Sequence, residues 1–217
     1  MESHSKLNLA IPFYVPNLIG YVRLILIITG HLFKDESPFT AVLFYAIFAT
    51  LDGIDGWVAR KLNQCSSFGA WLDVIVDNIG RTLIWSNFKW GVVVSNLEWV
   101  TYVCNHCHGA GWREQLWKDS FANAPSYVKR VMAEGFKTPY GILAIGGLHV
   151  LPIWMFGWQH NVFETHFSFL PTWIILSGFI ILLSGRILCA MVELWCVKVH
   201  IQCLLMDEKP NHSKNSN

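Results

Sequence analysis

The sequence predicts an all-α, polytopic membrane protein with about six transmembrane helices. Hydrophobic residues make up 53% of the 217 residues and charged residues only 14%, whereas a soluble domain carries roughly a quarter charged residues. The chain also holds 11 Trp and 14 Phe, and aromatic side chains collect where a membrane meets water. Several apolar stretches approach the length of about 20 residues that a helix needs to cross a bilayer.

Six apolar segments are expected to form these helices. They cover Pro12–Phe33, Pro38–Ala59, Ser67–Trp85, Val92–Cys104 with its flanks, Pro139–Trp158 and Leu170–Val197. Proline lies at or near the start of four of them, where its missing N–H costs nothing. We therefore expect a membrane domain over residues 12–200, an N-terminal segment over 1–11, and a disordered polar tail over 201–217.

The positions of Lys and Arg predict how the chain is oriented. In a six-helix arrangement, most of the 16 basic residues fall on the side of the two termini, and only Lys34 and Lys89 fall on the other. Those on the terminal side are Lys6, Arg60, Lys61, Arg113, Lys118, Lys129, Arg130, Lys137, Lys198, Lys209 and Lys214. Because positive loops face the cytoplasm, both termini are expected there. The net charge of +1 gives no reason to expect a nucleic-acid partner.

Four aspartates lie inside the second and third apolar segments. Asp52 and Asp55 are three residues apart, and Asp73 and Asp77 are four apart, so each pair shares one face of a helix. The short link from Lys61 to Ser66 makes the two helices a hairpin that can bring all four carboxylates together. Each Asp at the centre of a bilayer costs roughly 2.5–3.5 kcal/mol, so a compensating charge is required.

Two divalent cations, Mg²⁺ or Mn²⁺, are the compensating charge that we expect. Both ions prefer oxygen ligands and are often completed by substrate phosphates, and paired ions stabilise phosphoryl transfer. The alternative is structural, with aspartates paired to Arg23 or Arg81 inside the bundle. A third interpretation is a divalent-cation transporter, since intramembrane carboxylates also form ion pathways, but the acidic hairpin has no internal repeat of the kind that many transporters show.

The hairpin resembles the signature of the CDP-alcohol phosphatidyltransferase family. The family pattern is D-x2-D-G-x2-A-R-x8-G-x3-D-x3-D, and residues 52–77 match all eight fixed letters. The resemblance extends over about residues 11–82, and Val15–Arg23 is most similar to family members that use inositol as the acceptor. It implies a membrane enzyme that transfers a phosphatidyl group from CDP-diacylglycerol to a small polar alcohol and releases CMP.

The resemblance also implies a role for individual residues. Asp52 and Asp73 would bridge two metal ions, Asp55 would hold the first, and Asp77 would hold the second and accept the proton of the incoming hydroxyl. Residues expected to contact the CDP-lipid are Gly56, Arg60, Ser66, Asn17 and Gly69. The family further implies a homodimer. For a eukaryotic chain it implies the endoplasmic reticulum membrane, with the active site toward the cytoplasm.

The second half of the chain leaves the acceptor open. Inositol is the expected alcohol, with glycerol phosphate as an alternative, and a CDP-amino-alcohol donor with diacylglycerol as another. A catalytically silent lipid-binding relative is a further alternative, although all four aspartates are present. Arg186 is a candidate contact for the acceptor or a phosphate, and it is equally compatible with pairing to Glu193 two turns along the same helix.

Overall fold

The computed structural model describes residues 8–106 and 120–206, and these residues form helices and connecting turns without any strand. The α-helices are α1 (Val15–Leu32), α2 (Pro38–Lys61), α3 (Ser67–Trp85), α4 (Gly91–His106), α6 (Ser126–Met132), α7 (Pro139–Gln159), α8 (Val162–His166) and α9 (Thr172–Met206). Two short 3₁₀ turns, η1 (Ile11–Phe13) and η2 (Ala133–Gly135), precede α1 and α7. The all-α prediction is confirmed. Helix α9 continues past residue 200, where we expected the membrane domain to end, and residues 207–217 lie outside the described part.

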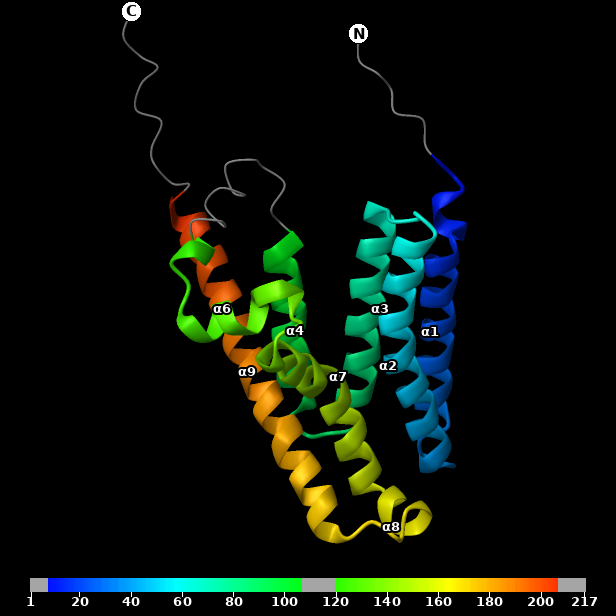
Figure 1. Ribbon diagram of the computed structural model, residues 1–217. Coiled ribbons are helices and arrows are strands. Elements are labelled where there is room, and N and C mark those ends of the chain that lie inside the picture. The colour runs from blue at the N-terminus through cyan, green and yellow to red at the C-terminus, as the bar shows by residue number, and fades with distance from the viewer. Residues whose placement is uncertain (1–7, 107–119, 207–217) are drawn as a thin grey trace, which may run out of the picture.

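The helices pack as two groups that meet along the molecule (Figure 1). Helix α1 packs against α2 and α3, while α9 packs against α7 and α4. Contacts of α3 with α4 and of α2 with α7 join the two groups. The two described ends, the start of η1 and the end of α9, lie at the same end of the bundle as the link between α2 and α3 (Figure 1).

Among residues 8–106 and 120–206, four helices are long and apolar enough to cross a membrane, namely α1, α2, α7 and α9. The other two expected spans exist as helices but differ in character. Helix α3 carries Asp73, Asp77 and Arg81, and the described part of α4 has 16 residues, or about 24 Å at 1.5 Å per residue. The described residues therefore contain four candidate membrane spans, and the larger number stays a prediction.

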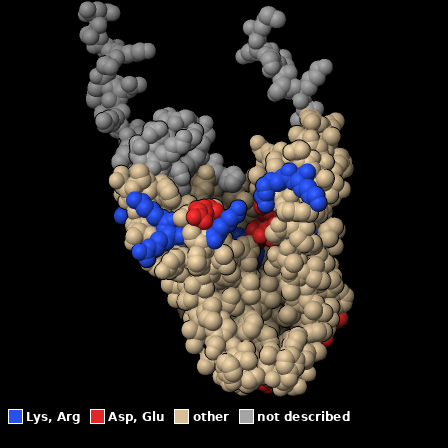
Figure 2. All heavy atoms as spheres, viewed as in Figure 1, with Lys and Arg blue, Asp and Glu red and all other residues tan. Residues whose placement is uncertain are grey.

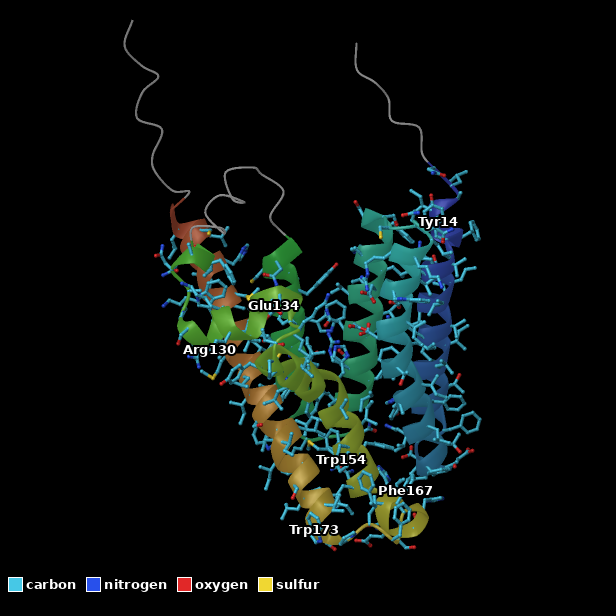
Figure 3. The ribbon with its side chains drawn as sticks, viewed as in Figure 1. Tyr14, Arg130, Glu134, Trp154, Phe167 and Trp173 are labelled. Atoms are coloured by element: carbon cyan, nitrogen blue, oxygen red, sulfur yellow. The ribbon has the colours of Figure 1, made fainter. Side chains whose placement is uncertain are left out.

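The outer surface has the character of a surface that faces lipid. Large apolar side chains stand out from the long helices, such as Ile25 (64% exposed), Ile142 (63%) and Trp173 (67%). Figure 2 shows Lys and Arg gathered at the end of the molecule that holds the α2–α3 link, above a broad uncharged face. Arg130 and Glu134 lie toward this end, whereas Trp154, Phe167 and Trp173 lie in the opposite half (Figure 3). An uncharged band between two polar or aromatic ends is what a bilayer requires.

Local sequence signals explain where the helices near the site begin. The hydroxyl of Ser66 accepts a hydrogen bond from the Gly69 N–H at 3.0 Å and so caps α3. Asn63 has a positive φ of 54° directly after α2, a conformation that ends helices and that Asn tolerates. The Gln64 side chain accepts a hydrogen bond from the Val15 N–H at 2.9 Å. The link between α2 and α3 is thereby tied to the start of α1.

Candidate active site

The four aspartates of α2 and α3 converge on one buried side chain of α1, Arg23. Its Nη1 lies 2.7 Å from Asp55 Oδ2 and 2.8 Å from Asp73 Oδ1. Its Nη2 lies 2.8 Å from Asp52 Oδ1 and also contacts Asp77 Oδ1. The side chain of Arg23 is fully buried, with its guanidinium 5.1 Å from the ring centre of Phe48. The hairpin therefore brings its carboxylates to one point, as the spacing predicted.

The structural alternative for the aspartates is also partly realised, because both arginines that the sequence offered as partners bind them. Besides the contacts of Arg23, Arg81 Nη1 lies 3.1 Å from Asp77 Oδ2. The pairing does not balance the charge. Six buried or half-buried carboxylates (Asp52, Asp55, Asp73, Asp77, Glu98 and Glu193) face three arginines (Arg23, Arg81 and Arg186) in one connected set of ion pairs. By formal charge, the set therefore has three more carboxylates than guanidinium groups.

The carboxylate oxygens fit a site for hard divalent cations. One ligand atom from each of Asp52, Asp55 and Asp73 lies within 4.8 Å of the others, and the same holds for Asp52, Asp77 and His149. The two groups share Asp52. The fit rests on three features: oxygen donors predominate, the carboxylates already surround one cationic group, and the excess charge is negative. His149 was not among the expected ligands; it lies on α7, with its Nε2 3.9 Å from Asp77 Oδ2.

A pocket opens beside the acidic cluster, between the start of α1 and the α2–α3 link. Its cavity volume is about 200 Å³, below the roughly 300–1,000 Å³ usual for sites that enclose a small molecule. The pocket is lined by every residue that the sequence assigned to the CDP-lipid, together with two of the aspartates: Asn17, Gly56, Arg60, Ser66, Gly69, Asp55 and Asp73. Asp52 and Asp77 do not line it. The pocket therefore contacts only half of the acidic cluster.

Two glycines determine the shape of the pocket wall. A Cβ at Gly69 would lie 2.9 Å from Asn17 Oδ1 and 3.1 Å from Ser66 Oγ, so α1 and α3 could not approach as closely with any other residue there. A Cβ at Gly56 would lie 3.5 Å from Arg60 Nη1, so the exposed guanidinium lies over this glycine. Asn17 is itself buried, and its amide donates to the Ile11 carbonyl at 2.6 Å.

The structure places Arg186 away from the pocket. Its Nη1 lies 2.9 Å from Glu193 Oε2, which is the pairing that the sequence offered as the alternative to acceptor binding, and its Nη2 lies 3.3 Å from Glu98 Oε1. Glu98 is a residue that the sequence reasoning missed. A signal existed, because Glu98 is the one acidic residue within the apolar segment Val92–Cys104, and such residues are rarely without function or partner.

Comparison with known proteins places the chain among lipid transferases. The family model for CDP-alcohol phosphatidyltransferase matches residues 13–148, more than half of the chain. A CDP-diacylglycerol–inositol 3-phosphatidyltransferase of Candida albicans is 41% identical over 80 residues, which is 36% of this chain and 35% of that protein. The enzyme of the same name from Rattus norvegicus is 48% identical over 64 residues, 30% of each chain.

The similarity to these relatives is local. The matched part spans about a third of the length of each curated relative. No solved structure matches the chain. The family model, in contrast, covers the acidic hairpin, the pocket residues and the part of α7 that ends at residue 148, directly before His149. The chain belongs to the CDP-alcohol phosphatidyltransferase family.

Proposed function

We propose that the protein transfers a phosphatidyl group from CDP-diacylglycerol to a small alcohol, with myo-inositol as the acceptor. The observation that carries the proposal is the convergence of Asp52, Asp55, Asp73 and Asp77 beside a pocket that is open to a ligand. Arg60 at the pocket offers a guanidinium to a pyrophosphate, and Gly56 and Gly69 in the pocket wall allow a nucleotide to approach the helices closely.

The reaction is a substitution at the phosphorus atom on the lipid side of the pyrophosphate. The hydroxyl oxygen of the acceptor forms a bond to this phosphorus, the bond from phosphorus to the oxygen of CMP breaks, and CMP leaves. Asp77 accepts the hydroxyl proton through its Oδ2. This oxygen faces His149, which lies on α7. Arg60 and Asn17 orient the nucleotide end, and Gly56 and Gly69 allow it to lie close to the helices.

Two Mg²⁺ or Mn²⁺ ions would be held by the four aspartates. When bound, they would supply positive charge to the pyrophosphate and to the oxygen of the leaving CMP. The membership of Asp52 in both groups of ligand atoms supports a role for it in holding both ions.

The choice of inositol rests on the names of the relatives and on the similarity of the first third of the chain. Relatives from Candida albicans and Rattus norvegicus are named for transfer to inositol.

We further propose six membrane spans, a homodimer in the endoplasmic reticulum membrane, and a cytoplasmic active site. The gathering of Lys and Arg at the end that holds the α2–α3 link supports this orientation (Figure 2).

Release of CMP by the purified protein tests the proposal. The protein in mixed micelles would receive CDP-diacylglycerol, Mg²⁺ or Mn²⁺, and inositol, glycerol phosphate, serine or no alcohol, each with a chelator control. We expect chelator-sensitive release with inositol alone. Release with another alcohol would keep the reaction and replace the acceptor. No release with any acceptor, from folded protein that binds Mn²⁺, would reject the donor and favour a CDP-amino-alcohol or a silent relative.

A further inference from the structure

A chain of buried charged side chains runs from the acidic cluster across the bundle. It begins at Asp77 on α3, whose Oδ2 accepts from Arg81 Nη1 at 3.1 Å. Arg81 Nε donates to Glu98 Oε2 on α4 at 2.6 Å, and Glu98 Oε1 accepts from Arg186 Nη2 on α9 at 3.3 Å. Arg186 Nη1 in turn donates to Glu193 Oε2 at 2.9 Å. Four of these side chains are nearly inaccessible: Arg81, Glu98, Arg186 and Glu193 are each 5–7% exposed.

Arg81 is held in one orientation by this arrangement. Its Nε is bound to Glu98, its Nη1 to Asp77, and its Nη2 to Asn78 Oδ1 at 2.7 Å. The guanidinium is planar and rigid, so three partners on three of its edges leave it no freedom to turn. A second link joins α3 and α4 next to Arg81, because the side chain of Trp99 on α4 donates through Nε1 to Thr82 Oγ1 on α3 at 3.0 Å.

The same arrangement sets the direction of the Asp77 carboxylate. One of its oxygens, Oδ1, faces Arg23, and the other, Oδ2, faces Arg81 and lies 3.9 Å from His149 Nε2. Glu98 binds Arg81 through Nε, whereas Asp77 binds it through Nη1. Without the Glu98 carboxylate, Arg81 would lose the hydrogen bond that holds its Nε and would keep only those to Asp77 and Asn78.

We propose that Arg81, held in place by Glu98, is a positioning residue that directs the Asp77 carboxylate toward the reacting hydroxyl. The inference rests on the proposed phosphatidyl transfer and on the role of Asp77 in it. A displacement of about 1 Å at a reacting group can lower a rate about 100-fold. A substitution at Glu98, which does not line the pocket, would therefore act on turnover through Arg81.

The test compares Glu98→Gln with Glu193→Gln. Both variants remove one buried negative charge from the same chain of ion pairs with little change of shape, but Glu193 is separated from Asp77 by three side chains. For Glu98→Gln we expect kcat to fall about 10-fold or more, KM for CDP-diacylglycerol to stay within about twofold, and Mn²⁺ to bind more weakly in electron paramagnetic resonance titrations. Glu193→Gln should lower the melting temperature similarly, with kcat and Mn²⁺ binding unchanged.

Glu98→Asp serves if the Gln variant does not fold. It keeps the charge and withdraws the carboxylate by one methylene, so kcat should fall while the melting temperature stays close to that of the wild type. Equal loss of kcat in Glu98→Gln and Glu193→Gln, or wild-type kcat and Mn²⁺ affinity in both Glu98 variants, would overturn the positioning role. Mn²⁺ titration requires no turnover, so it shows whether Glu98 controls the Asp77 carboxylate even where the wild type releases no CMP, and a failure of the proposed function is thereby distinguished from a failure of this inference.

Discussion

At the scale of single residues, the site is a balance between four carboxylates and one guanidinium. Arg23 reaches Asp52, Asp55, Asp73 and Asp77 at once from a fully buried position. A buried cation of this kind offsets the repulsion between the four carboxylates, which would otherwise oppose folding. The same four aspartates are also among the residues that offer ligand atoms for a divalent cation. A bound metal ion would therefore share these residues with Arg23, and each should influence the binding of the other.

Replacement of Asp77 by Asn should abolish turnover and leave the fold intact. The change removes the proton acceptor and one metal ligand, so kcat for CMP release should fall at least about 100-fold. The hydrogen bonds to Arg23 and Arg81 are weakened, but one charge is also removed from a set with an excess of negative charge, so the melting temperature should change little. Asp35→Asn, an exposed position beyond the end of α1, is the control. Turnover within about tenfold of the wild type would contradict the role of Asp77.

Arg23→Gln should make the protein depend on metal for its stability. Loss of one partner of a buried ion pair costs about 3–5 kcal/mol, and here four carboxylates lose the same partner. The melting temperature in a chelator should therefore fall strongly, and added Mn²⁺ should raise it more than in the wild type. Lys61→Gln, at an exposed cation that ends α2, should show neither effect. An equal Mn²⁺ effect in wild type and Arg23→Gln would speak against shared ligands.

At the scale of helices, the crossing of α7 and α9 depends on two glycines. A Cβ at Gly147 would lie 2.1 Å from the backbone nitrogen of Arg186, and a Cβ at Gly185 would lie 2.1 Å from the carbonyl oxygen of Leu143. Backbone atoms cannot move aside as the end of a side chain can, so the two helices would have to separate. Small residues commonly allow such close crossings in membrane proteins.

Gly147→Ala should therefore destabilise the fold, whereas Gly146→Ala should not. Overpacking of a close contact costs about 1–3 kcal/mol, and thermal unfolding in detergent should show a lower melting temperature for Gly147→Ala. A Cβ at the neighbouring Gly146 meets nothing within 4 Å, so the change there should be neutral or stabilising by up to about 1 kcal/mol because Ala favours helix. The same melting temperature for both variants would show that α7 and α9 do not cross at Gly147.

At the scale of the whole molecule, the apolar outer surface and the polar end define how the protein lies in a membrane. Single cysteines placed at positions 36 and 64 of a cysteine-free variant should react with an impermeant reagent from opposite sides. Position 64 should react from the cytoplasm, because the α2–α3 link lies at the end where Lys and Arg gather. Labelling of both positions from one side would show that α2, which lies between them, does not span the membrane.

The sequence by itself determined the class of the fold and the acidic hairpin. Membrane character follows from composition, which does not depend on how helices pack. The meeting of Asp52 and Asp55, or of Asp73 and Asp77, follows from helical spacing alone, and a short link makes the helices neighbours. The pocket residues from Gly56 to Gly69 follow for the same reason, since they lie on or beside that hairpin.

Only the tertiary structure decided which side chains from other helices complete the site. Arg23 from α1 and His149 from α7 lie beside the aspartates. Glu98 from α4 and Arg186 from α9 join them only through Arg81. Their meeting depends on the rotation and crossing of whole helices, which close contacts such as the one at Gly147 set. No fixed spacing in the sequence encodes such contacts, because the energy that favours them is spread over many packed side chains.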